Sequence, residues 1–322
     1  MSLLDSNRKR SSGTFSTVDS LLEISDREEL NPLQDLISVA DLAQRALPDE
    51  FSALKRLTTS QLYRQKLLNN RLDLRDLNRY ENVLAFADSL VWLDESKNLN
   101  PDNYINANKV NSPFREEGSR AFIATQGPLP NTTPNFWRMV LKYKVPLIVA
   151  IVEPELLGRK CHSYFPVKRA SSVSFGAFEV YLEESFASDF MTLRTLRVVN
   201  RASTESHSLT HVHLTAWPDG GAVPPKHKEN FLQVLDMIGA YFEDFKARPI
   251  IVHCSAGIGR TCTLIGAFYL FDHWQLCRKL KQEFKFSVFK LVKHLRGYRW
   301  RAVQTLEQYT FLYELAASFI SF

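Results

Sequence analysis

The sequence predicts an α/β (α+β) domain in which helices flank a central mixed and highly twisted sheet. Two observations indicate this class. In several short segments rich in β-branched residues, apolar side chains alternate with a period of two residues. Segments with helical periodicity lie between them. Of the 322 residues, 45% are hydrophobic and 23% are charged, as in ordinary globular proteins. One large domain with an N-terminal extension fits this length, although on length alone two small domains fit as well.

Six segments are predicted to be strands: 121–125, 147–152, 178–182, 192–199, 208–215 and 249–253. Five segments are predicted to be helices: 134–143, 226–246, 259–275, 286–295 and 305–320. No internal repeat or low-complexity block interrupts them. Because strands and helices are interleaved along the chain, we expect one sheet with mixed strand directions.

The chain is expected to divide into three parts. Residues 1–35 are rich in Ser, Asp, Glu and Arg without sustained periodicity, which predicts a flexible tail. In residues 36–77 apolar side chains return at helical spacing, and Pro48 followed by two acids is typical of a helix start. We therefore expect two or three short helices packed on a main domain that spans 78–320.

The net charge of +5, from 40 basic and 35 acidic residues, suits an anionic ligand without requiring one. The basic run at 8–10 is too short to indicate nucleic-acid binding. No apolar stretch approaches the ~20 residues that a membrane span needs. The four cysteines show neither a disulfide framework nor metal-ligand spacing. We expect a cytoplasmic monomer without metal or cofactor; a pathogen protein delivered into a host cell would show the same features.

Residues 249–261, PIIVHCSAGIGRT, form the most informative segment. An apolar strand ends at His253 and Cys254, a short loop with two glycines follows, and Arg260 opens an apolar helix. Glycines let backbone N–H groups converge, and such groups at a helix N-terminus bind a phosphate-sized anion. The same dipoles favour the thiolate of Cys254, and the planar fork of Arg260 can hold two oxygens. A buried cysteine in a turn would explain Cys254 alone, but not this combination.

The segment resembles the His-Cys-x5-Arg-Thr signature of the cysteine-based protein tyrosine phosphatases. Arsenate reductases and dual-specificity phosphatases share its shorter Cys-x5-Arg element. The resemblance implies hydrolysis of phosphotyrosine in proteins through a cysteinyl-phosphate intermediate on Cys254. It assigns supporting catalytic roles to His253 and to Thr261, whose hydroxyl can donate to the sulfur. It assigns phosphate binding to Arg260 and to the loop residues Ser255, Ala256, Gly257, Ile258 and Gly259.

Two further motifs match the same family. Residues 215–219, TAWPD, resemble its mobile acid loop, although Pro-Asp-Gly alone indicates only a turn. Asp219 would protonate the leaving tyrosyl oxygen and then act as a base, while Trp217 and Pro218 form a hinge and a stiff corner. Residues 304–309, QTLEQY, resemble the glutamine loop, in which Gln304 positions the attacking water and Gln308 assists.

Residues 78–83, NRYENV, resemble the phosphotyrosine recognition loop. Tyr80 would stack on the substrate ring, and Asn82 would hold the substrate backbone where the family often has Asp or Asn. Lys160, in the segment KCHSYFP, is expected to approach the closed acid loop. Glu155, five residues earlier, is expected either to orient Arg260 or to be an exposed carboxylate. The resemblance covers residues 78–318, with the motifs in family order.

The sequence departs from the family pattern at three places. Gly220 and Gly221 lengthen the acid loop by one residue, which leads to the hypothesis of faster or wider loop motion. Cys262 replaces a usual glycine; a packing role is favoured over a redox partnership with Cys254. Arg301 lies near the expected pocket rim and predicts a preference for acidic residues beside the phosphotyrosine.

Two rival functions stay open. A pseudophosphatase that binds phosphotyrosine without turnover usually lacks the cysteine, the acid or the arginine, and all three are present here. A dual-specificity or phosphoinositide phosphatase is disfavoured by the Tyr80 loop and by the absence of extra lysines beside Cys254.

Overall fold

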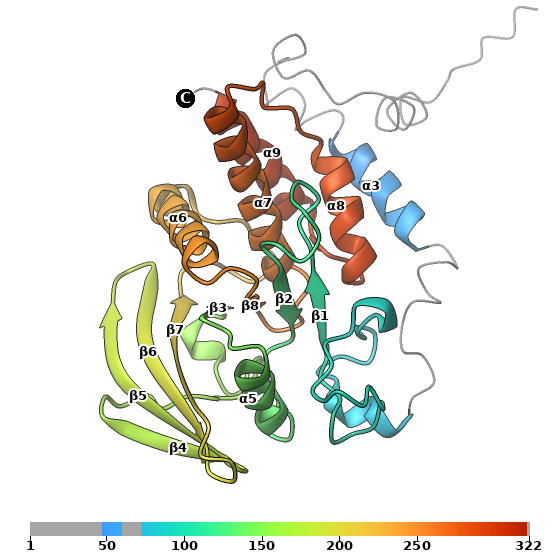
Figure 1. The fold of residues 1–322 in the computed structure, drawn as a ribbon. Coiled ribbons are helices and arrows are strands. Elements are labelled where there is room, and N and C mark those ends of the chain that lie inside the picture. The colour runs from blue at the N-terminus through green and yellow to red at the C-terminus, as the bar shows by residue number, and fades with distance from the viewer. Residues whose placement is uncertain (1–46, 60–71, 321–322) are drawn as a thin grey trace, which may run out of the picture.

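The computed structural model describes residues 47–59 and 72–320. The predicted tail and much of the predicted helical extension lie outside the described residues. Within them, helices surround a mixed eight-stranded sheet with the strand order β1-β2-β8-β3-β7-β6-β5-β4 (Figure 1). The fold class predicted from the sequence is confirmed.

The six predicted strands are all present, and two short strands were not predicted. The predicted segments correspond to β2 (Phe122–Thr125), β3 (Leu147–Ile151), β5 (Phe178–Ala187), β6 (Met191–Asn200), β7 (Ser206–Leu214) and β8 (Ile250–His253). The two others are β1 (Ala107–Val110) and β4 (Ser171–Phe175), one at each edge of the sheet. Both are only four or five residues long, and the three central residues of β4 are exposed, so neither carries a strong apolar pattern.

The helices also follow the predicted pattern. They are α3 (Leu47–Thr58), α5 (Thr133–Lys142), α6 (Lys228–Asp244), α7 (Arg260–Leu280), α8 (Val288–Tyr298) and α9 (Leu306–Ile320). Short 3-10 turns occur at η1 (Leu72–Leu77), η2 (Ala87–Ser89), η3 (Pro154–Leu156) and η4 (Pro225–His227). None of the described helices is both long and apolar enough to span a membrane.

The sheet is parallel at its centre and antiparallel toward its edges. Strands β2, β8, β3 and β7 run parallel to one another, whereas β1 pairs antiparallel with β2, and β4, β5, β6 and β7 form an antiparallel meander. The carboxyl ends of the four parallel strands therefore meet at one edge, which is where ligands bind in sheets of this kind.

Alternate side chains of the central strands point into two separate cores. In β3, Val149 packs in the core beneath α6, α7, α8 and α9, whereas Ile148 packs in the core beneath α5. Both side chains are fully buried. Burial on both faces explains why the central strands are apolar throughout, as expected for parallel strands covered by helices.

Candidate active site

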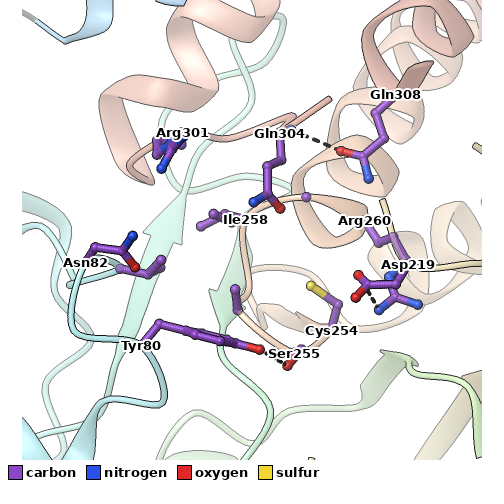
Figure 2. Close-up of a pocket in the computed structure, with 13 residues that line it drawn as sticks. Tyr80, Asn82, Asp219, Cys254, Ser255, Ile258, Arg260, Arg301, Gln304 and Gln308 are labelled. Carbon is purple, nitrogen blue, oxygen red and sulfur yellow. Dashed lines mark hydrogen bonds and ion pairs between the residues drawn. The ribbon is translucent and has the colours of Figure 1, made fainter. Parts of the chain in front are cut away.

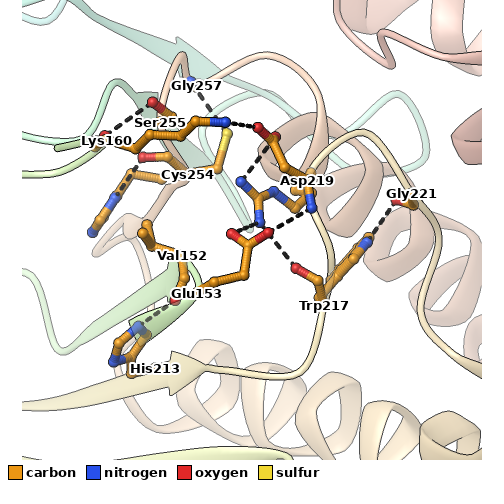
Figure 3. Close-up of polar contacts among 12 residues, drawn as sticks. Val152, Glu153, Lys160, His213, Trp217, Asp219, Gly221, Cys254, Ser255 and Gly257 are labelled. Carbon is orange, nitrogen blue, oxygen red and sulfur yellow. Dashed lines mark hydrogen bonds and ion pairs between the residues drawn. The ribbon is translucent and has the colours of Figure 1, made fainter. Parts of the chain in front are cut away.

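The site is assembled from loops that follow the parallel strands. Cys254 comes directly after β8, Glu153 lies two residues beyond β3, and the loop that carries Asp219 follows β7. Because these strands are neighbours in the sheet, their carboxyl ends bring the three side chains together, as Figure 3 shows.

The loop between β8 and α7 turns its amides toward the sulfur of Cys254. The backbone N–H of Gly257 lies 3.3 Å from that sulfur. Gly257 has a φ of +72°, and a Cβ there would lie 2.2 Å from the carbonyl oxygen of Thr125, so only glycine fits. Helix α7 begins immediately afterwards at Arg260, which places its positive N-terminal end beneath the same point.

Arg299 holds the loop from below. Its guanidinium is fully buried and donates to the carbonyl oxygens of Gly257 at 3.2 Å and Ala256 at 3.1 Å. It also donates to the side chains of Asn106 and Asn108. With these carbonyls tied down, the loop amides are free to face the pocket. No motif in the sequence indicated this role.

Arg260 is 1% exposed and is held by three oxygens. Its Nη1 donates to Glu153 at 2.6 Å and to the carbonyl of Trp217 at 2.9 Å, and its Nη2 donates to Asp219 at 2.9 Å. Burial lowers the pKa of Arg260, but the negative charge of Cys254 and the bond to Glu153 outweigh it, so the pKa is raised.

Glu153, which no motif indicated, holds Arg260. Its carboxylate accepts from Arg260 and, through Oε1, from the backbone N–H of Asp219 at 2.7 Å. The physical reason is local: Pro154 starts a 3-10 turn, and Glu153 is the last extended residue before it, so it stays at the sheet edge. The side chain of Glu155 lies outside the described part of the structure.

The acid loop is closed over Arg260 and Cys254. Asp219 is 46% exposed and pairs with both Arg260 and Lys160, as predicted for Lys160 (Figure 3). Partial burial raises the pKa of Asp219, but the hydrogen bond from Lys160 and the charge of Arg260 outweigh it and leave the pKa below its usual value. Trp217 is buried, and its indole N–H donates to the carbonyl of Gly221 at 2.8 Å. The carbonyl of Pro218 accepts from the N–H of Gly221 at 3.3 Å.

A cavity of about 260 Å³ opens above Cys254. Tyr80 and Asn82 stand on one side of it and Gln304 and Gln308 on the other (Figure 2). The hydroxyl of Tyr80 lies 2.9 Å from Oγ of Ser255, so the aromatic wall contacts the loop directly. The remaining lining residues are Val83, Asp219, Ala256, Ile258, Gly259, Arg260 and Arg301.

Gln304 and Gln308 are joined at the cavity wall. The backbone N–H of Gln304 donates to Oε1 of Gln308 at 3.0 Å. The Nε2 of Gln308 is buried and has no partner in the structure. Both side chains lie beside Gly259, where an added Cβ would come within 3.3 Å of them. This arrangement leaves amide groups available for a ligand above the loop.

His253 lies behind the loop and is fully buried, so it supports the site without lining the cavity. Its Nδ1 faces the carbonyl of Cys254 at 3.1 Å and must carry the proton. Its Nε2 then accepts from the hydroxyl of Tyr164 at 2.7 Å, which in turn accepts from His211 at 2.7 Å. Burial lowers the pKa of His253 to about 4, so the ring is neutral near pH 7.

Two other residues singled out from the sequence, Thr261 and Cys262, follow the loop of Cys254 and do not line the cavity. Thr261 is fully buried and its hydroxyl has no hydrogen-bond partner in the structure, so the predicted bond to the sulfur of Cys254 is not formed. Burial raises the pKa of the Cys262 thiol to about 12. A thiol that stays protonated is a poor nucleophile, which favours the packing role over the redox role.

Taken together, the fold and the site define a class: a twisted α/β domain that presents a cysteine, an arginine and an aspartate to one anion-binding loop. A family model described as protein-tyrosine phosphatase matches residues 74–318. The chain is 31% identical over 298 residues to mouse tyrosine-protein phosphatase non-receptor type 20, covering 92% of this chain and 62% of that protein. It is 35% identical over 277 residues to human tyrosine-protein phosphatase non-receptor type 12, covering 83% of this chain and 34% of that protein.

Solved structures agree with these comparisons. The catalytic domain of human protein tyrosine phosphatase non-receptor type 18 matches with a TM-score of 0.72 and 30% identity, over 87% of this chain and 98% of that one. A structure of PTPN18 in complex with HER2 phosphopeptides matches with a TM-score of 0.73 and 31% identity, over 85% of this chain and 99% of that one. This chain belongs to the protein-tyrosine phosphatase family. It spans about three fifths of the length of the first of these relatives.

Proposed function

We propose that this chain hydrolyses phosphotyrosine in proteins through a cysteinyl-phosphate intermediate. One observation carries the proposal: the sulfur of Cys254, the guanidinium of Arg260 and the carboxylate of Asp219 face one small cavity. Membership of the family supports the reaction class. The phosphopeptides named for PTPN18 support a phosphotyrosine substrate by analogy.

In the first step, the thiolate of Cys254 attacks phosphorus and forms the S–P bond while the P–O bond to the tyrosyl oxygen breaks. The loop amides and Arg260 stabilise the equatorial oxygens, which is electrostatic preorganisation. In the structure, Asp219 accepts a hydrogen bond at the edge of the Arg260 guanidinium. A phosphate dianion replaces Asp219 as the acceptor at that edge. The protonated Asp219 then delivers its proton to the leaving phenol oxygen.

In the second step, water attacks phosphorus and the S–P bond breaks, which returns the thiolate and releases phosphate. Asp219, now ionised, accepts a proton from the water. Gln304 and Gln308 hold that water, a role supported by their position over Gly259 and by the unpartnered amide of Gln308.

Selectivity for phosphotyrosine comes from the depth of the cavity. Tyr80 is 37% exposed and forms one wall, where its ring stacks on a substrate ring. Asn82 at the rim hydrogen-bonds to the substrate backbone. A phosphoserine side chain is too short to place its phosphorus on Cys254 while its backbone lies at this rim.

The same proposal includes the setting of the enzyme. We expect the catalytic domain at 78–320, a monomer, a cytoplasmic location and no requirement for a metal or cofactor. Among the described residues no three His, Cys, Asp or Glu side chains are grouped to hold a metal ion.

Turnover of matched phosphotyrosine and phosphoserine peptides in EDTA tests this proposal. Wild type should hydrolyse the phosphotyrosine peptide selectively, and Cys254→Ser should lose turnover while it still binds the peptide. Equal turnover of both peptides would favour a dual-specificity enzyme. Binding by a well-folded wild type without turnover would favour a phosphotyrosine-binding module and overturn the proposed reaction.

A further inference from the structure

The acid loop is held from a side that no motif predicted. The carbonyl oxygen of Gly220 accepts from the hydroxyl of Thr305 at 2.8 Å. The backbone N–H of Ala222 donates to Oε1 of Glu307 at 3.0 Å. Both partners belong to the segment that starts α9, whereas Glu153 and Lys160, which contact Asp219, belong to the segment after β3.

The two adjacent glycines permit this approach. Gly220 has a φ of +75°, which a residue with a side chain rarely adopts. A Cβ on Gly221 would lie 3.0 Å from Cγ of Pro218 and 3.3 Å from Oε1 of Glu307. A side chain at that position would crowd Pro218 and the carboxylate of Glu307. The lengthened loop is therefore shaped to reach α9.

Thr305 uses both hydrogen-bonding capacities of its hydroxyl. Its oxygen accepts from the backbone N–H of Gln308 at 3.2 Å and so caps the start of α9. Its proton goes to Gly220. Because Gln308 also accepts from the N–H of Gln304, one short segment holds both the acid loop and the glutamines over the cavity.

One of the other bonds that close the loop, the pair between Asp219 and Arg260, depends on the empty state of Arg260. This pair is replaced when phosphate occupies the guanidinium. The bonds from Thr305 and Glu307 do not involve the anion-binding groups, so they persist in the substrate complex. They therefore hold the loop at the moment when Asp219 must donate its proton.

We propose that Thr305 and Glu307 are positioning residues that latch the acid loop over the substrate through Gly220 and Ala222. This inference rests on the proposed function for its effect on turnover. Loss of the latch opens the loop and slows proton donation to the leaving group, while the phosphate site stays intact.

The first test measures loop opening directly, without turnover. NMR relaxation dispersion at the amides of the acid loop should show a roughly tenfold higher open-to-closed ratio in the double variant Thr305→Val/Glu307→Ala, because two hydrogen bonds of ordinary net strength are lost. Glu314→Ala, at an exposed position on the same helix, should leave the ratio unchanged. An unchanged ratio in the double variant would overturn the latch, whether or not the protein turns over substrate.

The second test separates proton donation from a general defect. A poor leaving group needs the acid more than a good one does. The double variant should therefore lose up to about tenfold in kcat on a phosphotyrosine peptide but much less on 4-nitrophenyl phosphate, whose phenol is more acidic. Equal losses on both substrates would overturn the role in proton donation.

Conservative variants separate the latch from the stability of α9. Thr305→Ser keeps both bonds and Glu307→Gln keeps the acceptor. Both variants should therefore retain the wild-type ratio of kcat on the phosphotyrosine peptide to kcat on 4-nitrophenyl phosphate. Thr305→Asp keeps an acceptor for the helix cap but has no hydroxyl donor when ionised. It should therefore lose more activity on the phosphotyrosine peptide than on 4-nitrophenyl phosphate, as Thr305→Val should. If Thr305→Asp kept the wild-type ratio, the helix cap alone would explain the effect and the latch would be wrong. Inactive wild type would overturn the proposed function, and loop opening would still decide the latch.

Discussion

Arg299 shows how a residue outside the pocket fixes the chemistry inside it. Its buried guanidinium takes the carbonyl oxygens of Ala256 and Gly257. Because the peptide is planar, fixing the carbonyl of Ala256 turns the N–H of Gly257, on the other side of the same peptide, toward the sulfur. A carbonyl in the wrong orientation would place a partial negative charge against the bound anion. The anion site is thus built by a cation that never touches the anion.

Lys160 helps to lower the pKa of Asp219. It pairs with Asp219, and its hydrogen bond and charge help to hold the pKa of that carboxyl below its usual value. Because the cation stabilises the ionised form, its removal raises the pKa of Asp219.

Replacement of Lys160 by methionine should therefore move the alkaline limb of the pH profile. If Asp219 must be protonated to act, kcat/KM falls as pH rises through the pKa of Asp219, and the variant should keep activity to a higher pH. The measurement is kcat/KM for a phosphotyrosine peptide against pH. An alkaline limb that stays in place or moves to lower pH would contradict the assignment of Asp219 as the acid.

Residue-scale predictability was uneven for physical reasons. Cys254 and Arg260 were found because the loop between a strand and a helix leaves a compact linear pattern. Glu153 was missed because two glutamates lie two residues apart, and spacing from Lys160 pointed to Glu155. The choice depends on where the chain turns after β3, and the 3-10 turn from Pro154 decides it. Arg299, Thr305 and Glu307 form hydrogen bonds to loops far away in the sequence, which no spacing reveals.

At the scale of elements, α3 connects the N-terminal extension to the glutamine segment. Glu50 accepts from the hydroxyls of Tyr309 and Tyr313 on α9. Thr58 accepts from Arg296 at 3.0 Å, and Arg296 donates to the carbonyls of Ala302 and Val303, which precede Gln304. The helix therefore supports the segment that carries Gln304 and Gln308.

The main attachment of α3 is apolar. Phe51 is 3% exposed and its ring lies 5.2 Å from the ring of Tyr309. Phe51→Ala should lower the free energy of unfolding by about 3 to 5 kcal/mol, as for other buried phenylalanines. Leu57→Ala, at a side chain 40% exposed on the same helix, should cost less than about 1 kcal/mol. Urea unfolding measures both, and similar small losses would mean that α3 is not part of the folding unit.

Element boundaries could be predicted where burial is regular. Strands β3 and β8 are apolar at every position except the terminal His253 and lie between helices, so a short apolar run identified each of them. The predicted part of β5 stopped at residue 182, but the strand runs to Ala187. A bulge between Leu182 and Glu184 shifts its register. Beyond the bulge the side chains are exposed, which removes the apolar alternation.

At the scale of the whole molecule, buried histidines make stability depend on pH. Burial lowers the pKa of both His253 and His213 to about 4, and lowers that of His211 well below its usual value. In the unfolded chain these rings take up protons near pH 6.5. The unfolded state therefore binds more protons between pH 6.5 and about 4, so stability is lost as pH falls through this window.

Lowering the pH from 7.5 to 5.5 should reduce the free energy of unfolding by about 1 kcal/mol for each of His213 and His253. Urea unfolding at the two pH values measures this difference. His213 bonds to the carbonyl of Val152 at 2.7 Å, and the amide of a glutamine can keep that bond. The variant His213→Gln should therefore lose about 1 kcal/mol less than wild type between the two pH values. A midpoint independent of pH in this range would show that these rings are not held neutral.

The central claim is that Cys254 carries the phosphoryl group during turnover. The most direct test is rapid acid quenching of the Gln304→Ala variant with a phosphotyrosine peptide, followed by mass mapping. Slower attack by water should let the intermediate accumulate, so the peptide that contains Cys254 should gain one phosphoryl group, and Cys254→Ser should not show a thiol-linked phosphate. Steady turnover of phosphotyrosine with no phosphoryl group on Cys254 at any time point would contradict the account.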